Sequence, residues 1–152
     1  KNLNSARLFG NLFKSKLIDK TYLAICEGKP KLKESIVKLD IKGKNNKVEK
    51  TETFYQVLHN YMNVSLILFK PKTGKTHQIR IVSKNLGSPI IGDSKYNSQS
   101  KYKKETLKLN AYNLKFKINT KDYKFNSILP DDFNFFVKKN KIKYPNFLKV
   151  KF

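Results

Sequence analysis

The sequence predicts an α+β domain in which a mixed, mostly antiparallel sheet carries a few flanking helices. Segments rich in β-branched and aromatic residues follow one another in meander order, whereas helical spacing of apolar residues occurs in only three short stretches. The 152 residues, of which 39% are hydrophobic, are enough for one compact core. We therefore expect a single domain without a second one or an interdomain linker.

The N-terminal part predicts one helix and two strands. Apolar residues at i, i+1, i+4 and i+5 predict a helix over residues 4–13. Residues 20–27 are β-branched and aromatic and run into Gly28, so they predict a strand closed by a turn. A second strand is expected at 35–41, followed by a polar loop at 42–50.

The central part predicts a β-hairpin and then a helix. Residues 51–59 and 64–69 read as the two arms of the hairpin, and the second arm is almost continuously apolar. Residues 76–86 fit a helix that Gly87 ends. On this helix one face is apolar and the other presents His77, Arg80 and Lys84.

The C-terminal part predicts a loop, two paired strands and a short helix. Residues 94–105 are polar and loop-like. Residues 107–118 alternate as a strand but change register near 112–113, and residues 123–128 are expected to pair with them. A last helix is predicted to open at residues 130–132, where two carboxylates meet its positive end.

The charge of the chain indicates a polyanionic partner. Lys and Arg number 33 against 11 Asp and Glu, which gives a net charge of +22. A genome biased towards Lys and Asn codons would also raise this number. Such a bias does not explain why Arg7 and Arg80 remain arginines, whose planar guanidinium lysine cannot replace.

Several classes of protein are disfavoured by the sequence. No apolar run approaches the roughly 20 residues that span a bilayer, and the N-terminus has no apolar leader segment, so we expect no membrane partner. The single Cys26 excludes an internal disulfide framework and a cysteine-rich metal site, which fits a reducing compartment. The chain begins with Lys1 rather than Met, and we expect sequence upstream of it.

Three motifs at characteristic spacing are the most specific feature of the sequence. They are KTYLA at 20–24 followed by Gly28, PKTGKTHQIRI at 71–81, and GSPIIGD at 87–93 with Tyr96 beyond. Together they resemble the RluA-type RNA pseudouridine synthases, and LNAYNLKF at 109–116 and LPDDF at 129–133 resemble the ending of the C-type ribosomal members. The resemblance implies that residues 1–152 are the C-terminal part of one pseudouridine synthase catalytic domain.

The resemblance implies a catalytic role for two side chains. In this family an aspartate attacks the uridine, and the base is detached, turned and rejoined through carbon, without a metal or organic cofactor. Tyr22 matches the pocket tyrosine that lies against the base, and Arg80 matches the arginine that pairs with the attacking carboxylate. Judged without the family, Tyr22 would be a packing residue and Arg80 a solvated helix charge.

Further residues of the middle motif are expected to bind RNA. Lys75 stands at a glycine-rich turn suited to phosphate, although it is equally readable as a surface lysine. His77 either shapes the RNA groove or is hydrogen-bonded scaffolding. Asp93 is read as a turn residue rather than as the nucleophile. The full set of expected RNA-binding residues is Lys75, Thr76, His77, Gln78 and Lys84.

The sequence departs from the family at the attacking residue. Its Arg-Leu-Asp motif is absent from the chain and is expected upstream of Lys1, so the chain alone is predicted to be inactive. The complete protein is predicted to isomerise uridines of large-subunit ribosomal RNA, as a monomer in the cytoplasm or in an organelle. The alternative is a truncated or degenerate synthase that only binds structured RNA, and a ribosomal structural protein would leave the motifs unexplained.

Overall fold

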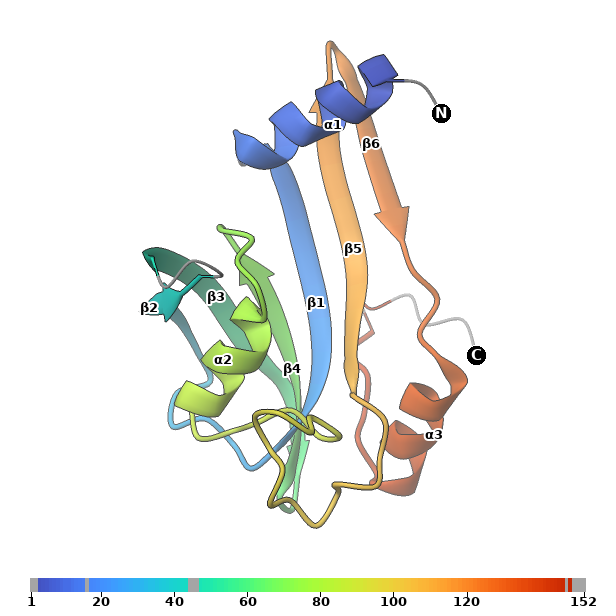
Figure 1. Cartoon of the computed structure of the whole chain (residues 1–152). Helices are drawn as coiled ribbons and strands as arrows, with labels where there is room; N and C mark the ends of the chain where they lie inside the picture. The colour runs from blue at the N-terminus through green and yellow to red at the C-terminus, as the bar shows by residue number, and fades with distance from the viewer. Residues whose placement is uncertain (1–2, 16, 44–46, 147, 149–152) are drawn as a thin grey trace.

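The computed structural model describes residues 3–15, 17–43, 47–146 and 148. Within them a six-stranded sheet, with strand order β2-β3-β4-β1-β5-β6, is accompanied by three helices (Figure 1). All the strand pairs of this part of the chain are antiparallel, as a mostly antiparallel sheet predicts. The elements are α1 (Leu3–Lys14), β1 (Ile18–Glu27), β2 (Glu34–Lys42), β3 (Val48–Tyr61), β4 (Val64–Pro71), α2 (Gln78–Asn85), β5 (Leu109–Ile118), β6 (Lys121–Asn126) and α3 (Asp131–Lys139).

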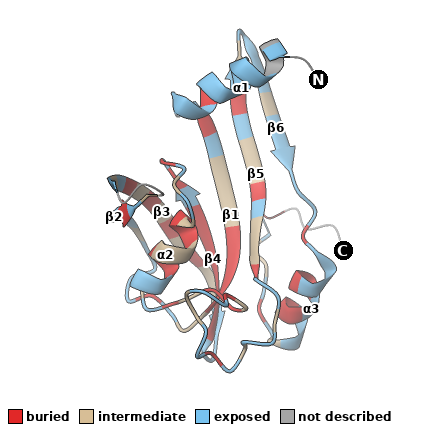
Figure 2. Cartoon of the chain, viewed as in Figure 1, coloured by how far each residue is buried: buried red, intermediate tan, exposed pale blue. Residues whose placement is uncertain are grey.

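The sheet separates two hydrophobic clusters, because successive side chains of a strand point to opposite faces. On one face, Ala24 and Cys26 of β1 pack with Ile79 and Val82 of α2. On the other face, Leu23 and Ile25 pack with α3, whose buried side chains include Phe133, Phe136 and Val137. Figure 2 shows that burial is deepest in β4 and the adjoining part of β1, between these two helices.

A buried lysine ties α3 to the sheet. Only 2% of the Lys108 side chain is exposed, and its Nζ donates hydrogen bonds of 2.8 Å to Asp132 Oδ2 of α3 and of 2.8 Å to Thr106 Oγ1. Glu105 lies 3.4 Å away and adds a second carboxylate. A buried ammonium is tolerated because it is paired in this way, so the position of α3 depends on an ionic contact as well as on its apolar face.

The predicted elements are confirmed, with shifts at several ends. The loop expected at 42–50 is shortened because β3 already begins at Val48, and residues 44–46 lie outside the described part of the chain. The helix predicted from Thr76 begins at Gln78, since His77 has a left-handed φ of 56° that no helical residue adopts. The strand predicted from Leu107 begins at Leu109.

The change of register predicted near residues 112–113 is confirmed. Thr21 of β1 pairs with Asn113 and Tyr22 pairs with Ala111, so Tyr112 is the extra residue of a β-bulge in β5. A bulge bends its strand and re-aims the neighbouring side chains. This one lies opposite Tyr22, the residue on which the sequence-based site prediction is centred.

Candidate active site

A pocket of about 360 Å³ lies between β1, the turn after β4 and the start of α2. It is on the face of the sheet that α2 covers, beside the cluster of Ala24, Ile79 and Val82. Its lining combines apolar side chains with three cationic ones. The lining residues are Phe13, Lys20, Tyr22, Pro71, Thr73, Gly74, Lys75, His77, Gln78, Ile79, Arg80 and Leu109.

Tyr22 contributes an aromatic wall to this pocket. It lies on the central strand β1, paired with Phe69 of β4 and Ala111 of β5, and is partly buried against the apolar cluster of the α2 face. Burial raises the pKa of its phenol, because the charged phenolate is the form that loses solvation. The hydroxyl therefore keeps its proton at neutral pH and is available as a donor in the pocket.

Arg80 is held in the first turn of α2 by a two-point contact with Asp93. Its Nε donates to Asp93 Oδ2 at 2.8 Å, and its Nη2 donates to Asp93 Oδ1 at 2.6 Å. The guanidinium carbon lies 5.1 Å from the ring centre of Tyr96, which adds a cation–π contact. The hydrogen bonds that Arg80 donates to Asp93 raise the pKa of the guanidinium, so its charge is permanent.

Gln78 braces the turn that carries the pocket rim. Its Oε1 accepts from Thr73 Oγ1 at 2.9 Å and from the Lys75 backbone N–H at 3.0 Å. Its Nε2 donates to Thr53 Oγ1 at 2.9 Å and to the Glu52 carbonyl at 3.3 Å. Because these bonds use both donors and both lone pairs, the amide is fully occupied by the protein itself. Its predicted contact with RNA stays a prediction.

Of the next three predicted RNA-binding residues, one lines the pocket and two lie outside its lining. Lys75 lines the pocket and pairs with Glu49 at 2.6 Å, so a phosphate there would compete with a carboxylate. Thr76 is exposed on the turn outside the pocket lining. Lys84 is exposed in the last turn of α2, where a cation favours the helix dipole, and also lies outside the lining.

His77 lies at the entrance to α2 and touches the neighbouring loop. Its Nδ1 is 3.2 Å from the Tyr96 hydroxyl, and the two rings meet edge to face with centres 5.8 Å apart. Burial lowers the pKa of His77, and the positive charges of Arg80 and Lys95 lower it further. The imidazole is therefore neutral at pH 7.

We expect His77 to titrate below its ordinary pKa of 6.5 in NMR spectra recorded across pH. As the pH drops, the histidine of the unfolded chain becomes protonated before that of the folded protein. The free energy of unfolding therefore falls as the pH drops from about 6.5 towards the lower folded-state pKa. Lys95→Gln should move the pKa of His77 upwards, because one repelling cation is lost, and Lys84→Gln serves as the control that leaves it unchanged. A His77 pKa at or above 6.5 would contradict this account.

Comparison with known proteins identifies the family of this chain. A model of the RNA pseudouridylate synthase family matches residues 1–85, a span that includes both Tyr22 and Arg80. The chain belongs to the RNA pseudouridylate synthase family. The family predicted from the three motifs is thereby confirmed.

Relatives within the pseudouridylate synthase family match most of the chain. An uncharacterized RNA pseudouridine synthase of Haemophilus influenzae is 36% identical over 149 residues, which cover 90% of this chain and 64% of that protein. Ribosomal large subunit pseudouridine synthase C of Rickettsia bellii is 37% identical, over 88% of this chain and 50% of its own length. The chain thus spans about half to two thirds of the length of these curated relatives.

Two solved structures of the pseudouridylate synthase family have the same fold. Human RNA Pseudouridylate Synthase Domain Containing 4 superposes with a TM-score of 0.86 at 24% identity, covering 95% of this chain and 70% of the human one. Human RNA Pseudouridylate Synthase Domain Containing 1 gives 0.72 at 25% identity, covering 86% and 61%. The predicted fold class is confirmed by these matches.

Three residues in or beside this synthase-family pocket have roles that were not anticipated from the sequence. Lys20 lines it next to Tyr22, its Nζ lies close to Gly74, and burial lowers its pKa. Asp93 and Tyr96 hold Arg80 and His77 from outside the lining. The sequence carried a signal for each, since all three belong to the quoted motifs, but a motif does not show which side chains meet.

The described residues contain no group of three or more His, Cys, Asp or Glu side chains placed to hold a metal ion. Cys26 is buried, and burial raises its pKa so strongly that the thiol remains protonated. None of the helices in the described ranges is long and apolar enough to cross a membrane.

Proposed function

We propose that the protein containing this chain isomerises uridine to pseudouridine in RNA, with large-subunit ribosomal RNA as its substrate. The observation that carries the proposal is the convergence of Tyr22 and Arg80 on one cationic pocket in a chain of the pseudouridylate synthase family. The choice of RNA is supported by the names of relatives such as ribosomal large subunit pseudouridine synthases C and D.

The pocket has the properties that this chemistry needs. A uridine must leave its stack to be reached, at a cost of a few kcal/mol that contacts in the pocket offset. The ring of Tyr22 and the apolar side chains of Ile79 and Leu109 offer surfaces for the base. Lys20 and Lys75 offer positive charge for the phosphates on either side of it.

The attacking carboxylate is proposed to come from a part of the protein outside these 152 residues. None of the six aspartates of the chain stands in an Arg-Leu-Asp motif, and the relatives are longer than the chain. In the assembled site, this carboxylate would approach Arg80, and the hydroxyl of Tyr22 would assist proton transfer at the carbon that gains the new bond. We propose accordingly that the chain alone binds RNA but does not isomerise uridine.

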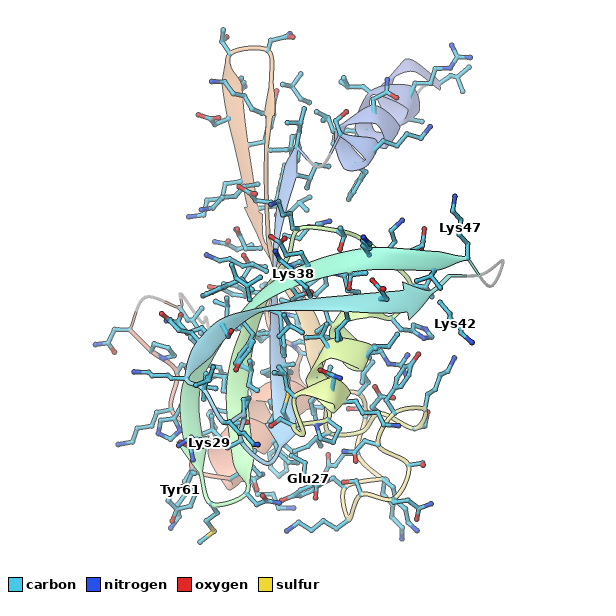
Figure 3. The ribbon with its side chains drawn as sticks, turned by 90° about the vertical axis from the view of Figure 1, so that its left-hand side faces the viewer. Glu27, Lys29, Lys38, Lys42, Lys47 and Tyr61 are labelled. Carbon is cyan, nitrogen blue, oxygen red and sulfur yellow. The ribbon has the colours of Figure 1, made fainter. Side chains whose placement is uncertain are left out.

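An exposed row of lysines at the β2 edge of the sheet is suited to a polyanion. Figure 3 shows Lys38, Lys42 and Lys47 along the hairpin of β2 and β3, at the outer edge of the sheet. All three are exposed, and the chain as a whole carries a net charge of +22. We propose that this surface attracts RNA electrostatically, and that the protein works as a monomer in the cytoplasm.

The test compares the complete protein with a variant whose Arg-Leu-Asp aspartate is replaced by Ala. Pseudouridines formed in large-subunit RNA are mapped by primer extension after carbodiimide treatment. The complete protein is expected to produce stops at defined uridines and the variant none. If the complete protein produces no stops, but both proteins bind RNA with an affinity that falls steeply with salt, only the alternative of a non-catalytic RNA-binding module remains.

A further inference from the structure

Asp93 is the buried partner of the pocket arginine. None of its side chain is exposed, against 18% for Arg80. It does not belong to α2 but to the loop that follows, directly after Gly92. Although burial pushes the pKa of Asp93 upwards, the hydrogen bonds from Arg80 and from two backbone N–H groups outweigh it and lower that pKa. The carboxylate is therefore charged at neutral pH.

The position of this carboxylate is set by its own loop rather than by Arg80. Its Oδ1 accepts the backbone N–H groups of Lys95 at 3.0 Å and Tyr96 at 2.9 Å, as in an Asx turn. The loop is closed further by Asn97, whose N–H donates to the Asp93 carbonyl at 2.8 Å. The backbone of Gly92 packs closely against the backbone of Thr106, which also holds the loop in place.

The contact leaves one side of the guanidinium for a ligand. Both hydrogen bonds to Asp93 use the Nε–Nη2 edge of Arg80, so among the described residues its Nη1 amine has no recorded partner. The ring of Tyr96 lies against the guanidinium and limits its rotation. A long, flexible side chain is thus held in one orientation before any ligand arrives, which removes an entropic cost of binding.

We propose that Asp93 is a positioning residue that aims Arg80 at the attacking carboxylate. This inference rests on the proposed function and adds a residue to it. Asp93 does not touch the reacting atoms but acts through Arg80. A merely structural Asp93 would hold its loop together without affecting the reaction in the folded protein.

The decisive variant is Asp93→Asn in the complete protein. The amide oxygen still accepts the two backbone N–H groups of the turn, because Asn also favours Asx turns, but the charge and the second acceptor for Arg80 are lost. We expect the single-turnover rate to fall by about 100-fold, as for other losses of a preorganised electrostatic contact. RNA affinity should change by less than about threefold, since the phosphate contacts remain. Asp93→Ser, whose hydroxyl also accepts from the turn, is the second variant and should behave alike.

A double-mutant cycle with Arg80→Gln separates positioning from folding. If Asp93 acts through Arg80, Asp93→Asn should lower the rate of the Arg80→Gln protein by less than about threefold, because the residue to be positioned is gone. Asp132→Asn is the matched control. It removes a carboxylate from the Lys108 pair at α3, so it should lower the melting temperature and leave the rate unchanged.

A second readout does not depend on activity. In NMR spectra of the 152-residue chain, the Nε–H signals of its two arginines, Arg7 and Arg80, are easily assigned. The Arg80 signal should exchange slowly with solvent and lose this protection in Asp93→Asn. Two results in an active protein would overturn this inference and leave the proposed function standing. In the first, Asp93→Asn keeps the full rate. In the second, Asp93→Asn lowers the rate of the Arg80→Gln protein by as much as it lowers the rate of the unsubstituted protein. An inactive unsubstituted protein overturns the proposed function and the role of Asp93 with it, while the NMR signal still reports whether the pair exists.

Discussion

Tyr22→Phe is expected to lower the single-turnover rate of uridine isomerisation by about 10²- to 10⁴-fold in the complete protein, the range typical of a lost acid–base group. The substitution removes one hydroxyl and keeps the ring that lines the pocket against Ile79 and Leu109. RNA affinity should therefore stay within about threefold, because stacking and phosphate contacts are retained. The loss falls on turnover rather than on binding.

Tyr55→Phe is the matched control for this experiment. Tyr55 and Tyr22 flank Phe69 in the same cross-strand row, but Tyr55 is buried and does not line the pocket. Its hydroxyl donates to the Leu32 carbonyl at 3.2 Å, so its loss should cost about 1 kcal/mol of stability and no activity. Equal rates for Tyr22→Phe and the unsubstituted protein would show that Tyr22 only packs.

Gly92→Ala is expected to destabilise the chain by about 3 to 5 kcal/mol, through overpacking and a strained backbone together. Gly92 has a φ of +75°, and a Cβ there would lie 2.0 Å from the Thr106 carbonyl oxygen and 2.7 Å from that of Glu105. Both obstacles are backbone atoms, so no side chain can move aside. Urea unfolding of the 152-residue chain, followed by circular dichroism, measures the difference.

Gly87→Ala and Gly10→Ala isolate the steric part of this effect. Gly87 has a similar φ of +70°, but nothing lies within 4 Å of its added Cβ, so only the backbone strain of about 1 kcal/mol is expected. Gly10 lies within α1 with open space around it, and alanine there should stabilise the helix by up to about 1 kcal/mol. Equal losses at Gly92 and Gly87 would refute the close approach to Thr106.

The elements and the local pairings of this fold were predictable from sequence because their causes are local. The hairpin of β3 and β4 follows from two apolar runs separated by a short polar turn. The bulge at Tyr112 was predictable because a change in the alternation of apolar residues marks it directly. The end of α2 was equally plain, since Gly87 adopts a positive φ that other residues avoid.

Long-range contacts were not predictable in the same way. Nothing near β1 in the sequence says that its neighbours are β4 and β5. The site shows the same limit: the motifs identified Tyr22 and Arg80, but not that Asp93 occupies one edge of the guanidinium. The start of α2 was misplaced for a different reason. His77 adopts a left-handed conformation within the turn that the hydrogen bond between Thr73 and Gln78 closes, and the helical pattern does not reveal this contact.

The central place of β1 in the sheet has a consequence for folding kinetics. Although β1 precedes the other strands in the sequence, its partners β4 and β5 are far along the chain, so a large share of the native contacts requires closure of long loops. The β3–β4 and β5–β6 hairpins can form early from local contacts. During synthesis, one edge of β1 has no partner strand until β5 has emerged from the ribosome. The unpaired backbone groups of this edge make β1 a segment exposed to premature association.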